Sequence, residues 1–227
     1  PLIAVLTMIR VDETRRRSDE GQQSAWSSLK EGFGYARSNV VVLSLLGLAA
    51  APSLLIGSSF QVMLPYFAER VFGMGAAGYS FLLAASGVGA ILGALGLSAM
   101  RTVSQKGKIV LGFTFAYASS IIAFAYGSWY LPVGVASLIL VAFGAAFVIH
   151  QASINTLLLS VAPHAMRGRI MGLYSMSIFG LQIFNGPALG TMAIILGMSA
   201  SMSILATAII CIIIFIAIKV PSLSKLN

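Results

Sequence analysis

The stretch HQASINTLLLSVAPHAMRGRIMG, residues 150–172, decides the fold class of this chain. It places a histidine, a glutamine and an asparagine inside an apolar run, continues to Pro163 and the basic group Arg167-Gly168-Arg169, and then begins a second apolar run. This order is typical of a membrane-spanning helix with a polar stripe that ends at the membrane surface in a tight basic turn. The stretch therefore predicts a membrane protein.

The composition of the whole chain supports the same class. Hydrophobic residues make up 58% of the chain and charged residues only 9%, against roughly 25% charged residues in a soluble domain. Four runs carry no formal charge and together hold more than four crossings of about 20 residues each. These runs are residues 40–67, 71–100, 109–166 and 170–218. The net charge of +8 falls in the short segments between the runs, so we expect no nucleic-acid partner.

Turn signals divide the longer runs into six spans. The third run is too long for one crossing and is expected to turn at Gly127 to Pro132, and the last run at Gly197 to Ser199. Pro52 is expected to kink the first span. The predicted spans are residues 40–66, 78–100, 109–126, 133–162, 170–196 and 200–218. We therefore predict an all-α membrane protein with a six-helix transmembrane bundle over residues 40–218.

The segments outside the bundle differ from it in character. Residues 1–9 are apolar but too short to cross a membrane, and we interpret them as the end of a preceding transmembrane helix, so that the chain would be a fragment. Residues 10–39 are expected to be a cytoplasmic linker. Its second half is either a short amphipathic helix at the membrane surface or an irregular segment. Residues 219–227 are expected to form a cytoplasmic tail.

The basic residues orient the bundle. Every lysine and arginine except Arg70 falls on one side of the six spans, and by the positive-inside rule this side is cytoplasmic. Both ends of the six-helix unit are then cytoplasmic. The basic residues of the two cytoplasmic loops, which are candidates for a role in gating, are Arg101, Lys106, Lys108, Arg167 and Arg169.

Polar side chains inside the spans are the candidates for a functional site. His150 is the ionisable group deepest in the predicted spans, and Gln151 and Asn155 share a helix face beside it. A polar group that faces lipid is costly, so these side chains are expected either to line a substrate cavity or to hydrogen-bond neighbouring helices. His150 is also a candidate for a titrating group. Further polar candidates for the same space are Gln61, Gln182 and Asn185.

Other motifs point to packing and away from catalysis. Gly89 and Gly93 form a small-xxx-small pair in the second span, which favours close approach of another helix. The sequence has no Walker glycine-lysine loop, no paired His or Cys ligands and no Ser-His-Asp set. We therefore expect no metal, no cofactor and no enzymatic activity, and the single Cys211 excludes an internal disulfide.

Three stretches resemble the carboxy-terminal half of a major facilitator superfamily transporter. They are SLKEGFGYARSN (28–39), LPYFAERVFGMGAAGYSFLLAASGVGAILGAL (64–95) and NTLLLSVAPHAMRGRIMGLYSM (155–176). Their order and spacing match over Ser28 to Leu223. The resemblance is to the branch that includes enterobactin-type siderophore exporters and macrolide efflux pumps, often labelled transmembrane secretion effectors.

The resemblance implies a twelve-helix transporter in which the six spans are helices seven to twelve, arranged as two inverted three-helix repeats. The first and fourth spans would line a central cavity, the second and fifth would pack against the amino-terminal half, and the third and sixth would face lipid. Gly186 and Gly190 would then be the fifth-span counterparts of Gly89 and Gly93. His164 stands where similar proteins often have an acidic residue, so no arginine-carboxylate latch is expected within the turn itself.

With these spans and polar side chains, the resemblance implies a secondary transporter that exports small amphipathic molecules, such as siderophores or drugs, across a bacterial inner membrane by alternating access. Its expected partners are the lipid bilayer, the amino-terminal half and the small-molecule substrate. The predicted spans hold no carboxylate, so a proton-coupling acid is expected in the other half unless His150 serves. The alternatives are the membrane domain of an ATP-binding-cassette transporter and a non-transporting scaffold or intramembrane enzyme.

Overall fold

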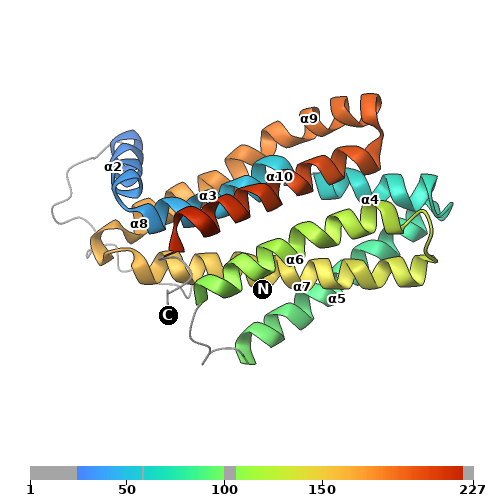
Figure 1. The fold of residues 1–227 in the computed structure, drawn as a ribbon, viewed down its shortest axis with the longest axis horizontal. Coiled ribbons are helices and arrows are strands. Elements are labelled where there is room, and N and C mark those ends of the chain that lie inside the picture. The colour runs from blue at the N-terminus through green and yellow to red at the C-terminus, as the bar shows by residue number, and fades with distance from the viewer. Residues whose placement is uncertain (1–24, 58, 100–105, 222–227) are drawn as a thin grey trace, which may run out of the picture.

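Helices make up all the regular secondary structure in the described part of the chain, which is residues 25–57, 59–99 and 106–221 of the computed structural model (Figure 1). The predicted all-α class is therefore confirmed. Six stretches of these residues are long and apolar enough to cross a membrane, with mean hydropathy between 1.5 and 2.8, and they match the six predicted spans. They are Val40–Arg70, Gly75–Ala99, Lys106–Gly127, Val133–Val161, His164–Leu196 and Met198–Lys219.

The segment before the first span forms helix α2 (Ala25–Ser38). It packs against helix α8 (Arg167–Ser175). Gly32 lies at this contact, where an added Cβ would meet the Arg169 backbone oxygen at 3.3 Å and the Leu173 side chain at 3.2 Å. Gly32 therefore lets the two helices approach each other, although glycine is an unfavourable residue inside a helix.

The first span consists of two helices, α3 (Val40–Leu55) and α4 (Ser59–Arg70). Asn39 is the N-cap of helix α3, and its side-chain oxygen accepts hydrogen bonds from the backbone N–H groups of Val41 and Val42 in the first turn. Pro52 was expected to kink the span. The structure shows instead a complete interruption one turn after this proline, and the N–H groups of Ile56 and Gly57 both donate to the Pro52 carbonyl oxygen.

The second and fourth spans are the continuous helices α5 (Gly75–Ala99) and α7 (Val133–Val161), and they pack closely against each other. Gly89 makes this approach possible, because an added Cβ there would collide with the backbone of Val141. Gly144 does the same from the α7 side, where a Cβ would collide with the backbone of Ser86. Helix α6 (Lys106–Gly127) forms the third span and also packs on α7.

The fifth span changes helix type along its length. A 3-10 turn at His164–Met166 leads into α8, a π-helical turn follows at Met176–Gly180, and α9 (Leu181–Leu196) completes the crossing. Gly197, with φ +83°, allows the sharp turn into α10 (Met198–Lys219), which is the sixth span. A π-helical turn inside a span is uncommon and often marks a functional region.

The helices form one elongated bundle in which the first three spans pair with the last three (Figure 1). The second span packs on the fourth, the first on the fifth, and the third on the sixth. A two-fold relation between the first three and the last three spans would turn the contact of the second and fourth spans into that of the fifth and first, so this pairing is compatible with two inverted three-helix repeats. The second and fifth spans bury the least, with 22% and 11% of their most apolar windows buried against 50% for the first span.

The two ends of the bundle differ in charge. Among the residues that the structure describes, every lysine and arginine except Arg70 lies in α2 or near the helix ends that meet at the left of Figure 1. The opposite end holds the turns after α4, α6 and α9. There the Trp129 indole N–H donates to the Ser199 hydroxyl at 2.9 Å and ties two of these turns together. Trp129 is exposed, as expected of an aromatic residue at a membrane interface.

Candidate substrate cavity at the interruption of the first span

A small cavity lies beside the interruption of the first span. It has a volume of about 80 Å³ and brings together the first, third, fourth and fifth spans. Its polar lining includes three of the predicted site residues, His150, Gln151 and Gln182. The other residues that line it are Pro52, Ser53, Gly57, Tyr117, Phe147 and Ile178. This volume has room for a few waters but is smaller than the roughly 300–1,000 Å³ of a typical small-molecule site.

His150 is held in the cavity wall by a defined hydrogen-bond chain. Its ring is 2% exposed, and its Nδ1 lies 2.7 Å from the Thr114 hydroxyl oxygen. The same hydroxyl donates to the Val110 carbonyl oxygen at 2.6 Å. A hydroxyl has a single hydrogen, so both contacts are hydrogen bonds only if Nδ1 carries a hydrogen and donates to Thr114. In neutral His150 the other nitrogen, Nε2, is then an acceptor.

Aromatic rings support the histidine from one side. The Tyr117 ring stacks on His150 with a centroid distance of 6.1 Å and an interplanar angle of 10°. Tyr117 also lies 5.1 Å from Phe143 and 5.8 Å from Phe147, and Phe143 stacks on Phe60 of α4 at 4.6 Å. Tyr117 and Phe147 form an apolar wall of the cavity next to its polar groups, and Phe143 and Phe60 pack behind Tyr117.

The remaining polar candidates lie in different surroundings. The Asn155 side chain interacts with the Tyr174 side chain of α8, and the Tyr174 hydroxyl donates to the Gln151 carbonyl oxygen at 3.3 Å. Asn155 therefore joins the fourth and fifth spans and does not line the cavity. Gln61 is exposed on α4 and is also outside the cavity lining.

Asn185 is buried at the interruption itself, with 2% of its surface exposed. Its side-chain nitrogen donates to the carbonyl oxygens of Leu54, at 3.1 Å, and Leu55, which are the last residues of α3. Its side-chain oxygen accepts a hydrogen bond from the hydroxyl of Ser59, the first residue of α4. The sequence identified Asn185 as a polar residue inside the membrane, but it gave no signal that would pair this residue with the end of α3.

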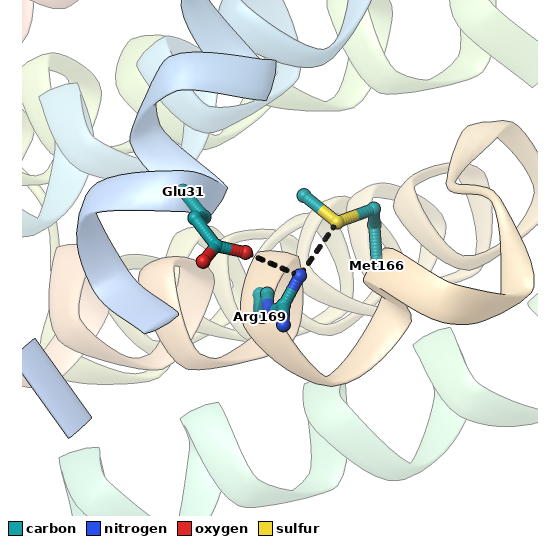
Figure 2. A network of polar contacts seen from close by, with 3 residues as sticks. All are labelled: Glu31, Met166 and Arg169. Atoms are coloured by element: carbon teal, nitrogen blue, oxygen red, sulfur yellow. Dashed lines mark hydrogen bonds and ion pairs between the residues drawn. The ribbon is translucent and has the colours of Figure 1, made fainter. Parts of the chain in front are cut away.

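The basic turn after α7 is fixed by contacts of both arginines. Arg167 donates to the Ala162 carbonyl oxygen at 3.4 Å, and its Nη1 lies 3.1 Å from His164 Nδ1. A guanidinium can only donate, so His164 accepts through Nδ1. Arg169 forms an ion pair with Glu31 of α2 at 2.7 Å and contacts the Met166 sulfur at 3.3 Å (Figure 2). The arginine-carboxylate contact that is absent within the turn is thus supplied by α2.

The other basic loop residues stand apart from this network. Lys106 is the first residue of α6 and is half-buried, and Lys108 is exposed. Lys106 lines a separate cavity of about 490 Å³ between the ends of α5, α6 and α7. Arg101 lies outside the described residues, as do residues 1–24 and 222–227 of the predicted linker and tail.

The two glycine pairs differ in their surroundings. Gly89 and Gly93 of α5 lie against the α7 backbone at Val141 and Ala145, where an added Cβ would collide. A Cβ at Gly190 of α9 would meet no atom within 4 Å. The close approach made by the first pair is therefore not repeated at Gly190 within this chain, and the packing role of Gly186 and Gly190 stays a prediction.

Comparison with known proteins places the chain in a family. No curated protein and no solved structure matches it. The family described as transmembrane secretion effector matches residues 1–227, which is the full length of the sequence. This match agrees with the six membrane-spanning helices and with the resemblance seen in the sequence. The chain therefore belongs to the transmembrane secretion effectors, a family of the major facilitator superfamily.

Proposed function

We propose that this chain is the carboxy-terminal half of a secondary active transporter of the efflux type, which exports small amphipathic molecules such as siderophores or drugs by alternating access. The observation that carries the proposal is the polar cavity at the interruption of the first span, lined by His150, Gln151 and Gln182. Polar side chains that face a cavity inside the membrane are typical of a substrate path. Interrupted helices at such a cavity are typical of secondary transporters.

In this proposal the cavity is the inner corner of a larger site that the amino-terminal half completes. Its volume of about 80 Å³ does not admit an amphipathic drug. The other half would pack on the second and fifth spans, which bury the least of their surface. The exposed side chains of Ile183, Phe184 and Ile194 on α9 support this arrangement, because they are 67% exposed or more. The open surface at Gly190 also supports it.

The orientation follows from the charge difference between the two ends of the bundle. The end with the basic residues of α2, α6, α8 and α10 would face the cytoplasm, and the end with Arg70 would face the outside. We propose that this membrane is the plasma (inner) membrane of a bacterium. Substrate would then enter from the end that holds the Glu31–Arg169 contact and leave at the end that holds Trp129.

The chemistry of the cavity suggests the kind of molecule that it contacts. His150 Nε2 offers an acceptor in the neutral ring, the amides of Gln151 and Gln182 offer donors and acceptors, and the ring of Tyr117 offers an apolar face. This set suits an amphipathic molecule with a hydrogen-bond donor better than a small ion of high charge. We assign His150 to hydrogen bonding with the substrate and a coupling carboxylate to the other half.

Transport by the full-length protein in proteoliposomes tests the function. A fluorescent amphipathic dye is expected to move when a proton gradient is imposed and no ATP is present. His150→Ala should reduce the flux more than His150→Gln, because the glutamine oxygen retains an acceptor. Ser120→Ala is the control, since the Ser120 hydroxyl donates to the Ala116 carbonyl oxygen of its own helix and Ser120 is not part of the cavity lining.

Each alternative predicts a different result. The membrane domain of an ATP-binding-cassette transporter would require ATP and a co-purified ATPase subunit for flux. A scaffold or an intramembrane enzyme would give no flux under either condition, and such a result with folded wild-type protein would overturn the proposal.

A further inference from the structure

We infer that Asn185 is a positioning residue that holds the two helices of the first span together at their interruption and thereby sets the shape of the cavity wall. The functional part of this inference rests on the proposed transport function. The hydrogen bonds that support the positioning role lie within this chain and do not depend on that proposal. A single side chain on the fifth span bonds the end of α3 and the start of α4. The cavity wall at Ser53 and Gly57 lies directly beside these bonds.

An interruption inside the membrane leaves backbone groups without helical partners. Lipid offers no hydrogen bonds, so these groups must be satisfied by the protein or by water in a cavity. At the end of α3 the carbonyl oxygens of Leu54 and Leu55 accept from Asn185, and the Ile56 carbonyl accepts from the Ser59 N–H at 2.7 Å. In a continuous helix the Ser59 N–H would donate to the Leu55 carbonyl oxygen, but here it donates to Ile56, and Asn185 supplies the donor to Leu55 instead.

The chemistry of the contact matches an amide side chain. The two hydrogens of the Asn185 nitrogen serve the two carbonyl oxygens, and its oxygen serves the Ser59 hydroxyl. Aspartate would lose both donors and place a charge beside carbonyl oxygens. Leucine of similar volume would lose all three bonds. Glutamine has the same groups on a side chain that is longer by one methylene.

The segment of the fifth span that carries Asn185 also contacts the interruption at a second point. Gln182 lies one turn earlier on α9, and its side chain packs so closely on Gly57 that an added Cβ would fall 2.7 Å from Gln182 Cγ. The π-helical turn at Met176–Gly180 packs against α3 just before this contact. The fifth span thus contacts the interruption through the amide of Asn185 and the aliphatic part of the Gln182 side chain, so we expect a shift of α9 to alter the arrangement of α3 and α4.

A distance measurement tests this role without a transport assay. Spin labels at Val40→Cys and Glu69→Cys, in a Cys211→Ala background, report the bend of the first span across roughly 44 Å. Both labelled sites are exposed. We expect a narrow distance distribution in the otherwise unaltered protein, a broad one with Asn185→Leu, and partial recovery with Asn185→Gln. The control is Thr191→Val on the same helix, whose exposed hydroxyl donates only to its own helix in this structure, and it should leave the distribution narrow.

Transport kinetics then connect the geometry to function. Asn185→Leu should change the half-saturating substrate concentration by about two- to thirtyfold, whereas a purely structural role would lower the amount of active protein and leave that concentration unchanged. Ser59→Ala should have a smaller effect of the same kind, and it should add nothing in the Asn185→Leu background, because both changes remove the same bond.

The outcomes separate this inference from the proposed function. A distribution that stays as narrow in Asn185→Leu as in the parent protein would overturn the positioning role. If Asn185→Leu does not fold, Ser59→Ala takes its place, and an unchanged distribution and half-saturation there would overturn it equally. A wild-type protein that transports nothing, but whose distribution broadens in Asn185→Leu, would contradict the transport function and leave the role of Asn185 at the interruption supported.

Discussion

The carboxylate of Glu31 lies 2.7 Å from a guanidinium nitrogen of Arg169 and fastens helix α2 to the first turn of α8 (Figure 2). The glutamate belongs to the segment before the first span, and the arginine belongs to the turn between the fourth and fifth spans. Gly32, next to the glutamate, lets the two helices touch. The helix before the bundle is therefore attached to the span that carries the π-helical turn and Asn185.

We predict that Glu31→Gln releases α2 without unfolding the bundle. The two side chains are 46% and 26% exposed, and an exposed ion pair of this kind contributes less than about 1 kcal/mol. The midpoint of thermal unfolding should therefore change little, while amide hydrogen exchange in α2 should become faster. High salt should reduce the difference between the variant and the wild type. Glu69→Gln at the other end of the bundle is the control, and equal exchange in α2 for both variants would contradict the prediction.

The crossing of α5 and α7 should be sensitive to a single methyl group at Gly89. Gly89→Ala places a Cβ against the Val141 backbone, which cannot rotate away, and overpacking of this kind costs about 1–3 kcal/mol. Gly87→Ala and Gly96→Ala on the same helix meet no atom within 4 Å and should be neutral or slightly stabilising. Thermal unfolding in detergent measures the difference. Equal midpoints for Gly89→Ala and Gly87→Ala would show that the helices cross elsewhere.

The hydrogen on His150 should reside on Nδ1, because the Thr114 hydroxyl already donates to Val110. Thr114→Val keeps the shape of the side chain but removes the acceptor, which leaves a buried N–H unpaired at a cost of about 1–3 kcal/mol. Nitrogen NMR of the imidazole rings measures the tautomer, and the sequence has only two histidines to assign. We expect Nδ1–H in the wild type and an increased Nε2–H population in Thr114→Val. Thr156→Val is the control, and a wild-type His150 that is protonated only on Nε2 would contradict the assignment.

The sequence predicted the number and the positions of the spans because each span and each turn has a local signal. The apolar runs have the length of a membrane crossing, and the turns at Gly127 to Pro132 and at Gly197 carry residues that end helices. The interruption of the first span has only part of such a local signal. Pro52 predicts a disturbance of the helix, but whether it becomes a kink or a break depends on what satisfies the freed carbonyl oxygens, and Asn185 is far away in the chain.

The same limit applies to the candidate site. A polar side chain inside a span needs a hydrogen-bond partner. The sequence does not say whether the side chain faces a cavity or bonds another side chain or a backbone carbonyl. His150, Gln151 and Gln182 line the cavity, whereas Asn155 contacts Tyr174 and Asn185 contacts the end of α3. Thr114 has no sequence signal, since a threonine in a span is common, and its role follows only from its distance to His150.

The cavity wall gives a final prediction at Gly57. An added Cβ would collide with the Ser53 carbonyl oxygen and lie 2.7 Å from the Gln182 side chain. The carbonyl belongs to the backbone and cannot move alone, so Gly57→Ala must shift α3 relative to α4 or displace Gln182 into the cavity of about 80 Å³. Either response alters the polar surface that the substrate is proposed to contact. We expect Gly57→Ala to lose transport while the protein remains folded, since the change affects only the interruption. Gly112→Ala on α6, which meets no atom within 4 Å, is the matched control. Equal dye flux for the two variants in proteoliposomes would show that the wall at Gly57 does not contribute to the transport path.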